Sequence, residues 1–120
     1  EKQGIQWMIA DSTMELYQSK LMVLHAAYLI DSGQDFKSEV SMAKHHVANA
    51  LWKIIDRAIQ VHGALGYSTD TPLAEMLTQA RWSRFADGAD EIHQMRIAQR
   101  TIAAYKDTGS TRTATGNLPL

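Results

Sequence analysis

The sequence predicts an all-α protein with the fold of an up-and-down four-helix bundle, and three observations support this. Apolar residues recur every three or four positions over long stretches, which is the spacing of one face of a helix. No stretch keeps the strict alternation of apolar and polar residues that a half-buried strand shows. Four helical segments follow in series, the first two long, as in a bundle of consecutive helices. We expect the bundle to occupy residues 1–106.

The first helix is expected over about residues 1–31. Glu1 already lies in the helical pattern, with no cap and no initiator methionine before it, so we expect the chain to be a piece of a longer protein. A second apolar line, from Ile5 to Ile30, indicates that this helix is covered on more than one side. Gly33 is a typical helix-ending residue. The main apolar stripe consists of Trp7, Ala10, Met14, Tyr17, Leu21, Leu24 and Tyr28.

The second helix is expected over about residues 37–63. Ser38 is its predicted N-cap, because a serine hydroxyl can accept a hydrogen bond from an amide of the first turn. Acidic Glu39 suits the positive end of the helix dipole. The apolar positions of this helix are Val40, Ala43, Val47, Leu51, Ile54, Ala58 and Val61, and the rhythm continues to Leu65.

The main break in the pattern is GALGYSTDTP, residues 63–72. Its two glycines allow backbone conformations that other residues avoid. Thr71 followed by Pro72 predicts an N-cap with proline at the first helical position. We expect the third helix over residues 72–85 and the fourth over 89–105, followed by a disordered tail, 107–120, that is small, polar and without period. The expected inward residues are Leu73, Met76, Leu77, Ala80, Ile92, Met95, Ala98 and Ile102.

Composition argues against several classes of function. The net charge is -1 and the 12 Lys and Arg residues are scattered, so no basic patch indicates nucleic acid or a membrane surface as a partner. No apolar run approaches the roughly 20 residues of a membrane span. There is no cysteine, no Glu-x-x-His pair, and no two of the five histidines lie three or four positions apart. We therefore expect no metal site.

The segment RFADGADEIHQ, residues 84–94, contains the main candidate for chemistry. Asp87 stands directly before a glycine at the expected entrance to the fourth helix. One interpretation is a helix cap that accepts from the amides of Ala89 or Asp90, which is typically worth about 1 kcal/mol. The other is a catalytic base, which requires a closed apolar pocket because aspartate in water is a weak base. The residues alone leave both interpretations open.

Residues 1–105 resemble the C-terminal helical domain of the FAD-dependent acyl-CoA dehydrogenases. The stretches that match are EKQGIQWMIAD, SMAKHHVANALWKIIDRAIQVHGALGY and DTPLAEMLTQARWSRFADGADEIHQMRIAQRTI. The run from Gln60 to Ile97 is the specific part. It is similar to the family pattern of Gln-x-x-Gly-Gly-x-Gly-Tyr, then Pro-Leu, Ala-Arg, an acidic residue before Gly, Glu-Ile and Ile-Ala.

The resemblance implies α,β-dehydrogenation of an acyl-CoA thioester, in which a carboxylate removes the α-proton while FAD accepts a hydride from the β-carbon. In many members the base is a glutamate directly before the glycine of the acidic-Gly loop. Asp87 holds that position here, so the chain looks like the branch that uses aspartate, whose animal members can be fused to a kinase-like domain.

The resemblance also implies contacts with FAD. Gln3 falls where the family contacts FAD near the start of this domain, and residues 60–64 fall where the bundle reaches the FAD of a neighbouring subunit. Ala64 replaces a glycine of the pattern, Ala89 replaces a common threonine and Glu91 replaces a common glutamine. The implied cofactor-binding residues are Gln3, Gln60, Val61, His62, Gly63, Ala64, Ala89 and Glu91.

The leading interpretation is thus the C-terminal domain of an acyl-CoA dehydrogenase that supplies the base, part of the FAD site and the oligomer interface. The alternative is a non-catalytic helical interaction module. The resemblance implies an acyl-CoA substrate, an acceptor of the electron-transfer flavoprotein type, and a homodimer or homotetramer. The expected location is the cytoplasm in a bacterium, or the mitochondrial or peroxisomal matrix in a eukaryote. Without the other domains we expect neither tight FAD binding nor catalysis.

Overall fold

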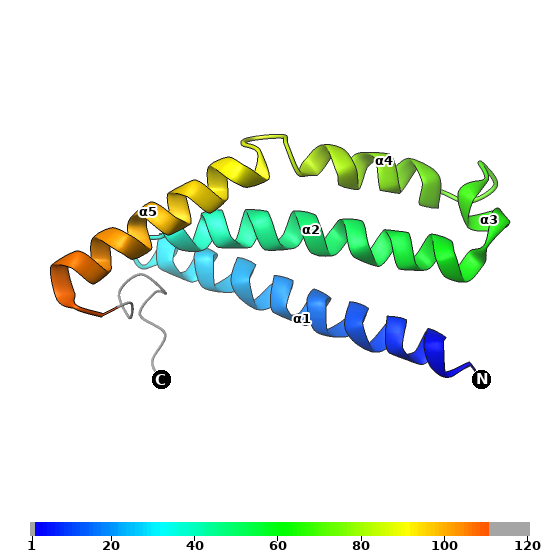
Figure 1. Cartoon of the computed structure of the whole chain (residues 1–120), viewed down its shortest axis with the longest axis horizontal. Helices are drawn as coiled ribbons and strands as arrows, with labels where there is room; N and C mark the ends of the chain where they lie inside the picture. Colours follow the sequence, from blue (N-terminus) through cyan, green and yellow to red (C-terminus); the bar gives the residue numbers. More distant parts are fainter. Residues whose placement is uncertain (1, 111–120) are drawn as a thin grey trace.

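The computed structural model describes residues 2–110, and these residues form five helices and no strand (Figure 1). The all-α prediction is therefore confirmed for this part of the chain. The helices are α1 (Gln3–Asp31), α2 (Lys37–His62), α3 (Ala64–Tyr67), α4 (Leu73–Ser83) and α5 (Asp90–Thr108). None of the helices within residues 2–110 combines the length and hydropathy needed to cross a membrane.

Helix α2 is the centre of the arrangement. Figure 1 shows α1 along one side of α2, and α4 with α5 along the other. Helices α1, α2 and α4 alternate in direction, as an up-and-down bundle requires, whereas α5 continues in the direction of α4 at an angle to it. Within the described residues, α1 contacts no helix except α2. The bundle is therefore open, because some helix faces are not covered by any other helix of the described residues.

The predicted bounds of the long helices agree with the structure to within a few residues, but α3 was not predicted. Gly66 explains why this short turn forms at the break. It is buried against the end of α2, where a Cβ atom would lie 2.9 Å from the Ile59 carbonyl oxygen and 2.9 Å from the His62 Cβ. Only glycine allows the chain to fold back so closely.

Two predicted helix caps are wrong. Ser38 lies buried within the first turn of α2, and the Lys37 amide donates instead to the Asp35 carboxylate at 3.2 Å. The Thr71 hydroxyl donates to the Leu65 carbonyl at 3.4 Å, and Pro72 takes the cap position without a side-chain bond. The α2 helix thus begins before Ser38, while the Thr71 hydroxyl is already bonded within the turn that precedes α4.

Helix α5 is longer than predicted. It continues to Thr108 and ends at Gly109, which has a left-handed φ of 69°. Residues 107 and 108, which were expected in the tail, therefore belong to α5. Residues 111–120 of the expected tail lie outside the described part of the chain.

The buried positions of the described chain are mostly small. Ala43, Ala48, Ala50 and Ala80 are buried, and Ile55 is 4% exposed. The main stripe of α1 does not face α2: its Trp7, Tyr17 and Leu24 side chains are 62%, 64% and 66% exposed. Of the residues expected inward on α5, Ile92, Met95 and Ile102 are also exposed. Small residues bring the helices close to α2, and the large apolar side chains face outward.

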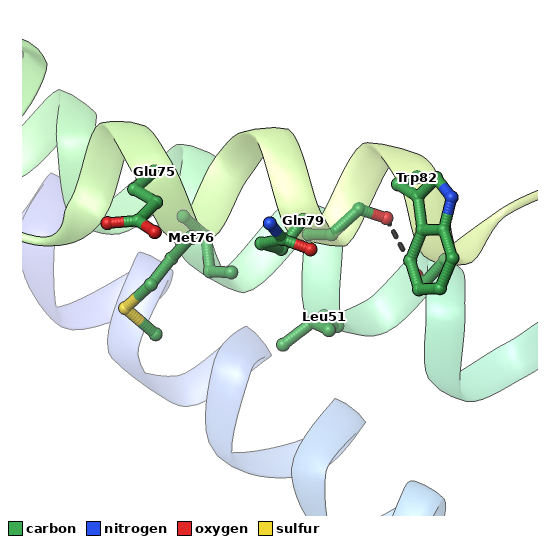
Figure 2. A pocket seen from close by; sticks show the side chains of 8 residues that line it. Leu51, Glu75, Met76, Gln79 and Trp82 are labelled. Carbon is green, nitrogen blue, oxygen red and sulfur yellow. Dashed lines mark hydrogen bonds between the residues drawn. The ribbon is translucent and has the colours of Figure 1, made fainter.

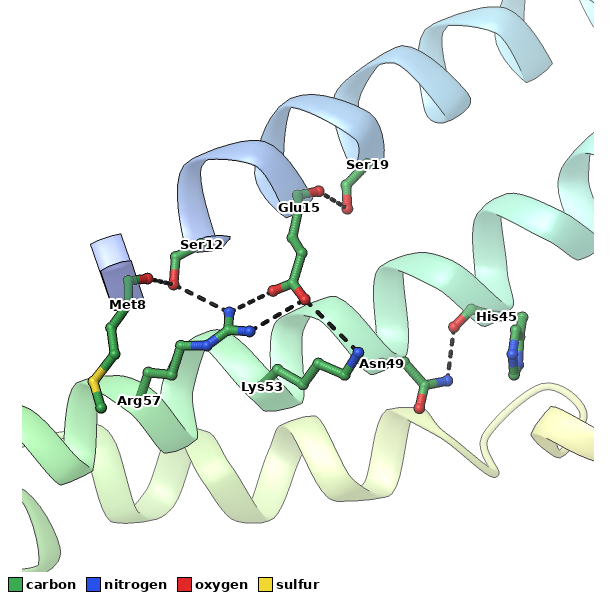
Figure 3. Close-up of polar contacts among 8 residues, drawn as sticks. All are labelled: Met8, Ser12, Glu15, Ser19, His45, Asn49, Lys53 and Arg57. Carbon is green, nitrogen blue, oxygen red and sulfur yellow. Dashed lines mark hydrogen bonds and ion pairs between the residues drawn. The ribbon is translucent and has the colours of Figure 1, made fainter. Parts of the chain in front are cut away.

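A polar contact fastens α1 to α2 (Figure 3). The Arg57 guanidinium donates to both oxygens of Glu15, at 2.6 and 3.3 Å, and to the Ser12 hydroxyl at 3.3 Å. The Lys53 ammonium lies 3.7 Å from Glu15. The hydrogen bond from Arg57, which outweighs the effect of partial burial, lowers the pKa of the Glu15 carboxyl.

The lowered pKa of Glu15 predicts how the stability of the chain depends on pH. The charged form stabilises the fold fully above the ordinary glutamate pKa of about 4.3, and this contribution is lost as the pH falls through the lower folded value. We expect Glu15→Gln to be less stable than wild type at pH 7, and the difference to shrink in acid. Urea unfolding of both chains between pH 7 and pH 3 measures this. A difference that stays constant with pH would contradict it.

Candidate active-site loop

The connection between α4 and α5 carries Asp87 on the surface. Asp87 is exposed and is the only residue other than glycine with a positive φ among the described residues, at 54°. Aspartate tolerates this left-handed conformation better than most residues, but it is still uncommon. The backbone therefore presents the Asp87 carboxylate from a constrained turn.

Gly88 is required at the next position for two reasons. Its φ of 107° lies outside the range that other residues prefer. A Cβ atom would also lie 3.0 Å from the Nε2 atom of His93, whose side chain is buried beneath the loop. Neither ring nitrogen of His93 has a hydrogen-bond partner within residues 2–110. The loop thus rests directly on the His93 ring.

Asp90 fixes the start of α5. Its buried carboxylate accepts from Arg84 Nε at 2.8 Å and from Asn49 Nδ2 at 3.1 Å, and His45 Nδ1 lies 3.4 Å away. Burial alone would raise the pKa of Asp90, but the hydrogen bonds from Arg84 and Asn49, helped by the charge of Arg84, hold the pKa below its ordinary value. Asp90 therefore stays charged and joins α2, α4 and α5.

The cap interpretation of Asp87 is wrong. The N-cap residue of α5 is Ala89, and no side chain bonds to the first turn as a cap. The Asp90 amide donates instead to the Arg84 carbonyl at 3.0 Å. The Arg84 carbonyl thus accepts the hydrogen bond that a capping Asp87 carboxylate would have accepted. The Asp87 carboxylate has no hydrogen-bond partner among the described residues.

The second predicted group of residues lies elsewhere. Residues 60–64 are all exposed at the end of α2, and Gln3 is exposed at the start of α1. Figure 1 places both of these segments at the same end of the molecule, with α4 between them and the Asp87 loop. An 11-residue helix is about 16 Å long. The structure therefore does not bring Asp87 together with residues 60–64 within one chain.

The two groups differ in how they suit a large, partly charged cofactor such as FAD. At Gly63 an added Cβ would meet no atom within 4 Å, so the exposed backbone there is open to close approach. Near Asp87, the amides of Gly88, Ala89 and Glu91 have no acceptor among the described residues. Because the Asp87 and Glu91 carboxylates are exposed beside them, these amides suit a neutral acceptor, such as a carbonyl or hydroxyl oxygen, better than a phosphate.

Apolar grooves lie outside the loop. The groove in Figure 2, between α2 and α4, has a volume of 310 Å³ and includes Leu51, Met76 and Trp82. A larger groove of 450 Å³ runs between α1 and α2 and reaches Val61 and His62 at its end. Neither groove is lined by Asp87. Both grooves therefore offer apolar surface away from the Asp87 carboxylate, which is itself exposed.

Sequence reasoning missed most of the residues that hold the loop. They are Lys44, His45 and Asn49 on α2, Arg84 at the end of α4, and His93 on α5. The positions at 44, 45 and 49 share one side of a helix by spacing, but nothing in the sequence says that this side faces residues 84–90. Only the packing of α5 on α2 reveals it.

Comparison with known proteins defines the class of this helical domain. Residues 1–102 match the family described as acyl-CoA dehydrogenase, C-terminal domain. The chain belongs to the acyl-CoA dehydrogenase family, and the part of the family it represents is that domain.

Individual relatives agree with this assignment. The chain is 44% identical over 96 residues to acyl-CoA dehydrogenase family member 10 of Mus musculus. This match covers 78% of this chain and 9% of the relative. A solved acyl-CoA dehydrogenase structure from Mycobacterium abscessus is 41% identical, with a TM-score of 0.81 over 83% of this chain and 25% of that one. The structure described as the FAD complex of PigA is 26% identical, with a TM-score of 0.80 over 82% of this chain and 26% of that one.

The chain spans only a fraction of such proteins. It covers between 9% and 27% of the length of eight curated relatives. The activity of a whole enzyme therefore involves much that these 120 residues do not contain.

Proposed function

We propose that this domain works in an FAD-dependent acyl-CoA dehydrogenase, where it supplies the catalytic base, part of the FAD site and an oligomer interface. The observation that carries the proposal is the state of Asp87. Its carboxylate is exposed, has no hydrogen-bond partner among the described residues, and stands on a loop held from α2 and α4. A surface aspartate without a structural task, in a constrained turn, suits a group that acts on a ligand.

Asp87 removes the α-proton of the thioester in this proposal. Bound FAD would supply the acceptor for the hydride that leaves the β-carbon. The carboxylate is exposed in the described chain, so other domains and the substrate itself have to exclude water from it. Removal of water strengthens a carboxylate as a base, because the charged form loses its hydration.

The FAD contacts divide between two places. The amides near Ala89 and Glu91 serve the cofactor beside Asp87, while residues 60–64 and Gln3 serve a second cofactor at the other end of α4. The separation of these two groups supports this division, since they do not meet within one chain. A structural relative is described as an FAD complex, which supports the cofactor. The side chains of Ala64 and Ala89 are methyl groups, so any hydrogen bond there is made by the backbone.

The exposed apolar faces support assembly. Large apolar side chains on α1 and α5 remain outside the contacts with α2, and extended apolar surface of this kind marks sites of association. We propose that other domains of the enzyme and further subunits, in a homodimer or homotetramer, cover these faces. An acceptor of the electron-transfer flavoprotein type would take the electrons onward.

A flavin measurement tests this function against the alternative of a non-catalytic interaction module. We expect the full-length protein to purify with about one flavin per chain, and acyl-CoA thioesters to bleach its absorbance in the absence of oxygen. We expect the isolated 120-residue chain to purify without flavin, because it holds only part of each site. A full-length protein without flavin, or one that no acyl-CoA reduces, would favour the interaction module. Near one flavin per isolated chain would contradict the division of the site.

A further inference from the structure

Lys44 lies in the first half of α2 and reaches the loop that carries Asp87. Its Nζ atom donates a hydrogen bond of 2.6 Å to the Gly88 carbonyl oxygen, although the two residues are 44 positions apart. The side chain is half-buried, and a hydrogen bond from a charged donor is stronger than one between neutral groups. The ammonium group therefore fixes the direction of the Gly88 carbonyl.

The direction of this carbonyl determines where the next amide points. The peptide bond between Gly88 and Ala89 is planar and trans, so the Ala89 N–H points opposite to the Gly88 C=O. Because the carbonyl faces Lys44, the Ala89 amide faces away from α2. No acceptor for this amide exists within residues 2–110. The amide is thus left available on the outer side of the loop.

The loop is held at a second point one peptide further on. The Asp90 amide donates to the Arg84 carbonyl at 3.0 Å, and the Asp90 carboxylate is bonded to the Arg84 and Asn49 side chains. The first point is the Gly88 carbonyl bonded to Lys44, and Asp87 and Ala89 are the residues on either side of Gly88. An uncommon backbone conformation such as that of Asp87 persists when the surrounding structure holds it, and the Lys44 bond holds the next residue, Gly88.

We propose that Lys44 is a positioning residue, which holds the Gly88 peptide so that the Asp87 carboxylate and the Ala89 amide are presented on the outer side of the loop. Its role in turnover rests on the proposed function of Asp87 as the base. The ammonium acts through the loop backbone and transfers no proton itself. Sequence reasoning assigned nothing to this lysine.

The test compares three variants of the full-length protein. Lys44→Met removes the donor and keeps the length of the side chain, whereas Lys44→Arg restores a donor. Lys53→Met is the matched control, because Lys53 lies on the same helix but faces Glu15 and α1. The first readout is hydrogen–deuterium exchange of the peptide that covers residues 85–92, in which the bonded Asp90 amide reports on the loop. The second is kcat and KM with an acyl-CoA thioester.

Lys44→Met is expected to speed exchange in this peptide by about tenfold, since a hydrogen bond to a charged group is lost. It is expected to lower kcat about 10- to 100-fold with little change in KM, because a small displacement of the base impairs the reaction more than binding. Lys44→Arg should recover most of both effects, and Lys53→Met should show neither.

Two results would overturn the proposal. Unchanged exchange in Lys44→Met would show that the lysine does not hold the loop. If Asp87→Asn inactivates the enzyme but Lys44→Met shows faster exchange with an unchanged kcat, the bond from Lys44 to Gly88 does not position the base. Failure of the base assignment itself is recognised separately, because Asp87→Asn would then remain active while the exchange result still reports on Lys44.

Discussion

Asp87→Asn in the full-length enzyme is expected to lower kcat by at least 10²- to 10⁴-fold, since that is what a missing general base typically costs. Asparagine has the same shape and also tolerates the left-handed conformation, so the loop should keep its structure. Flavin content should remain that of the wild-type enzyme, because no FAD contact is assigned to the Asp87 carboxylate. The measurement is steady-state turnover with an acyl-CoA thioester, together with the flavin absorbance of the purified protein.

The control for this variant is Glu75→Gln, which removes an exposed carboxylate from α4 outside the loop. It should leave turnover within a few-fold of wild type. Asp87→Glu keeps a carboxylate but lengthens the side chain by one methylene, so it should retain more activity than Asp87→Asn. Turnover of Asp87→Asn close to that of Glu75→Gln would place the base on another residue.

Arg84→Met is expected to lower the free energy of unfolding of the chain by about 3 kcal/mol at pH 7, because it leaves the buried Asp90 carboxylate without its cation. The Asp90 side chain is 6% exposed, whereas that of Arg84 is 33% exposed, so the carboxylate is the group that cannot regain water. Urea unfolding measures the change.

The pH dependence identifies the cause of this loss. In the wild type the pKa of Asp90 is held below its ordinary value. The charged Asp90 carboxylate therefore contributes fully to the free energy of unfolding above about pH 3.9, and this contribution is lost as the pH falls through the lower pKa of the folded state. Without Arg84 the burial of Asp90 dominates and favours the neutral carboxyl. The deficit of Arg84→Met should therefore be large at pH 7 and small near pH 3.

The control here is Arg81→Met, one turn earlier on α4. Arg81 is exposed and lies over the Phe85 ring, 5.6 Å from its centre, so its removal should cost less than about 1 kcal/mol. A loss for Arg84→Met no larger than that for Arg81→Met would mean that Asp90 does not depend on its ion pair.

The sequence predicted the long helices because their apolar periodicity is a local property. The same periodicity could not say which face meets which neighbour. The stripe through Trp7 and Leu24 predicted a covered face, but Ser19, Ala26 and Leu29 are the buried residues of α1. Within the described residues only α2 contacts α1, and it covers a different face from the one that the stripe predicted.

The candidate site shows the same limit. The position of Asp87 before Gly88 was readable, since an acidic residue before glycine is a local pattern. Its constrained backbone and the contacts from Lys44 and His93 were not, because they depend on how α2 and α5 pack. The predicted Asp87 cap failed for a related reason: the Asp90 amide donates to the backbone carbonyl of Arg84, and no residue pattern specifies that choice.

The role of Asp87 is tested most directly by exchange of the α-hydrogen of an acyl-CoA in deuterium oxide. A thioester that cannot complete the oxidation at its β-position isolates proton removal from hydride transfer. Mass spectrometry or NMR then measures deuterium at the α-carbon. The wild-type enzyme and Glu75→Gln should incorporate deuterium, while Asp87→Asn, with its flavin retained, should incorporate it at least about 100-fold more slowly. Incorporation by Asp87→Asn at the wild-type rate would contradict the central claim that Asp87 removes this proton.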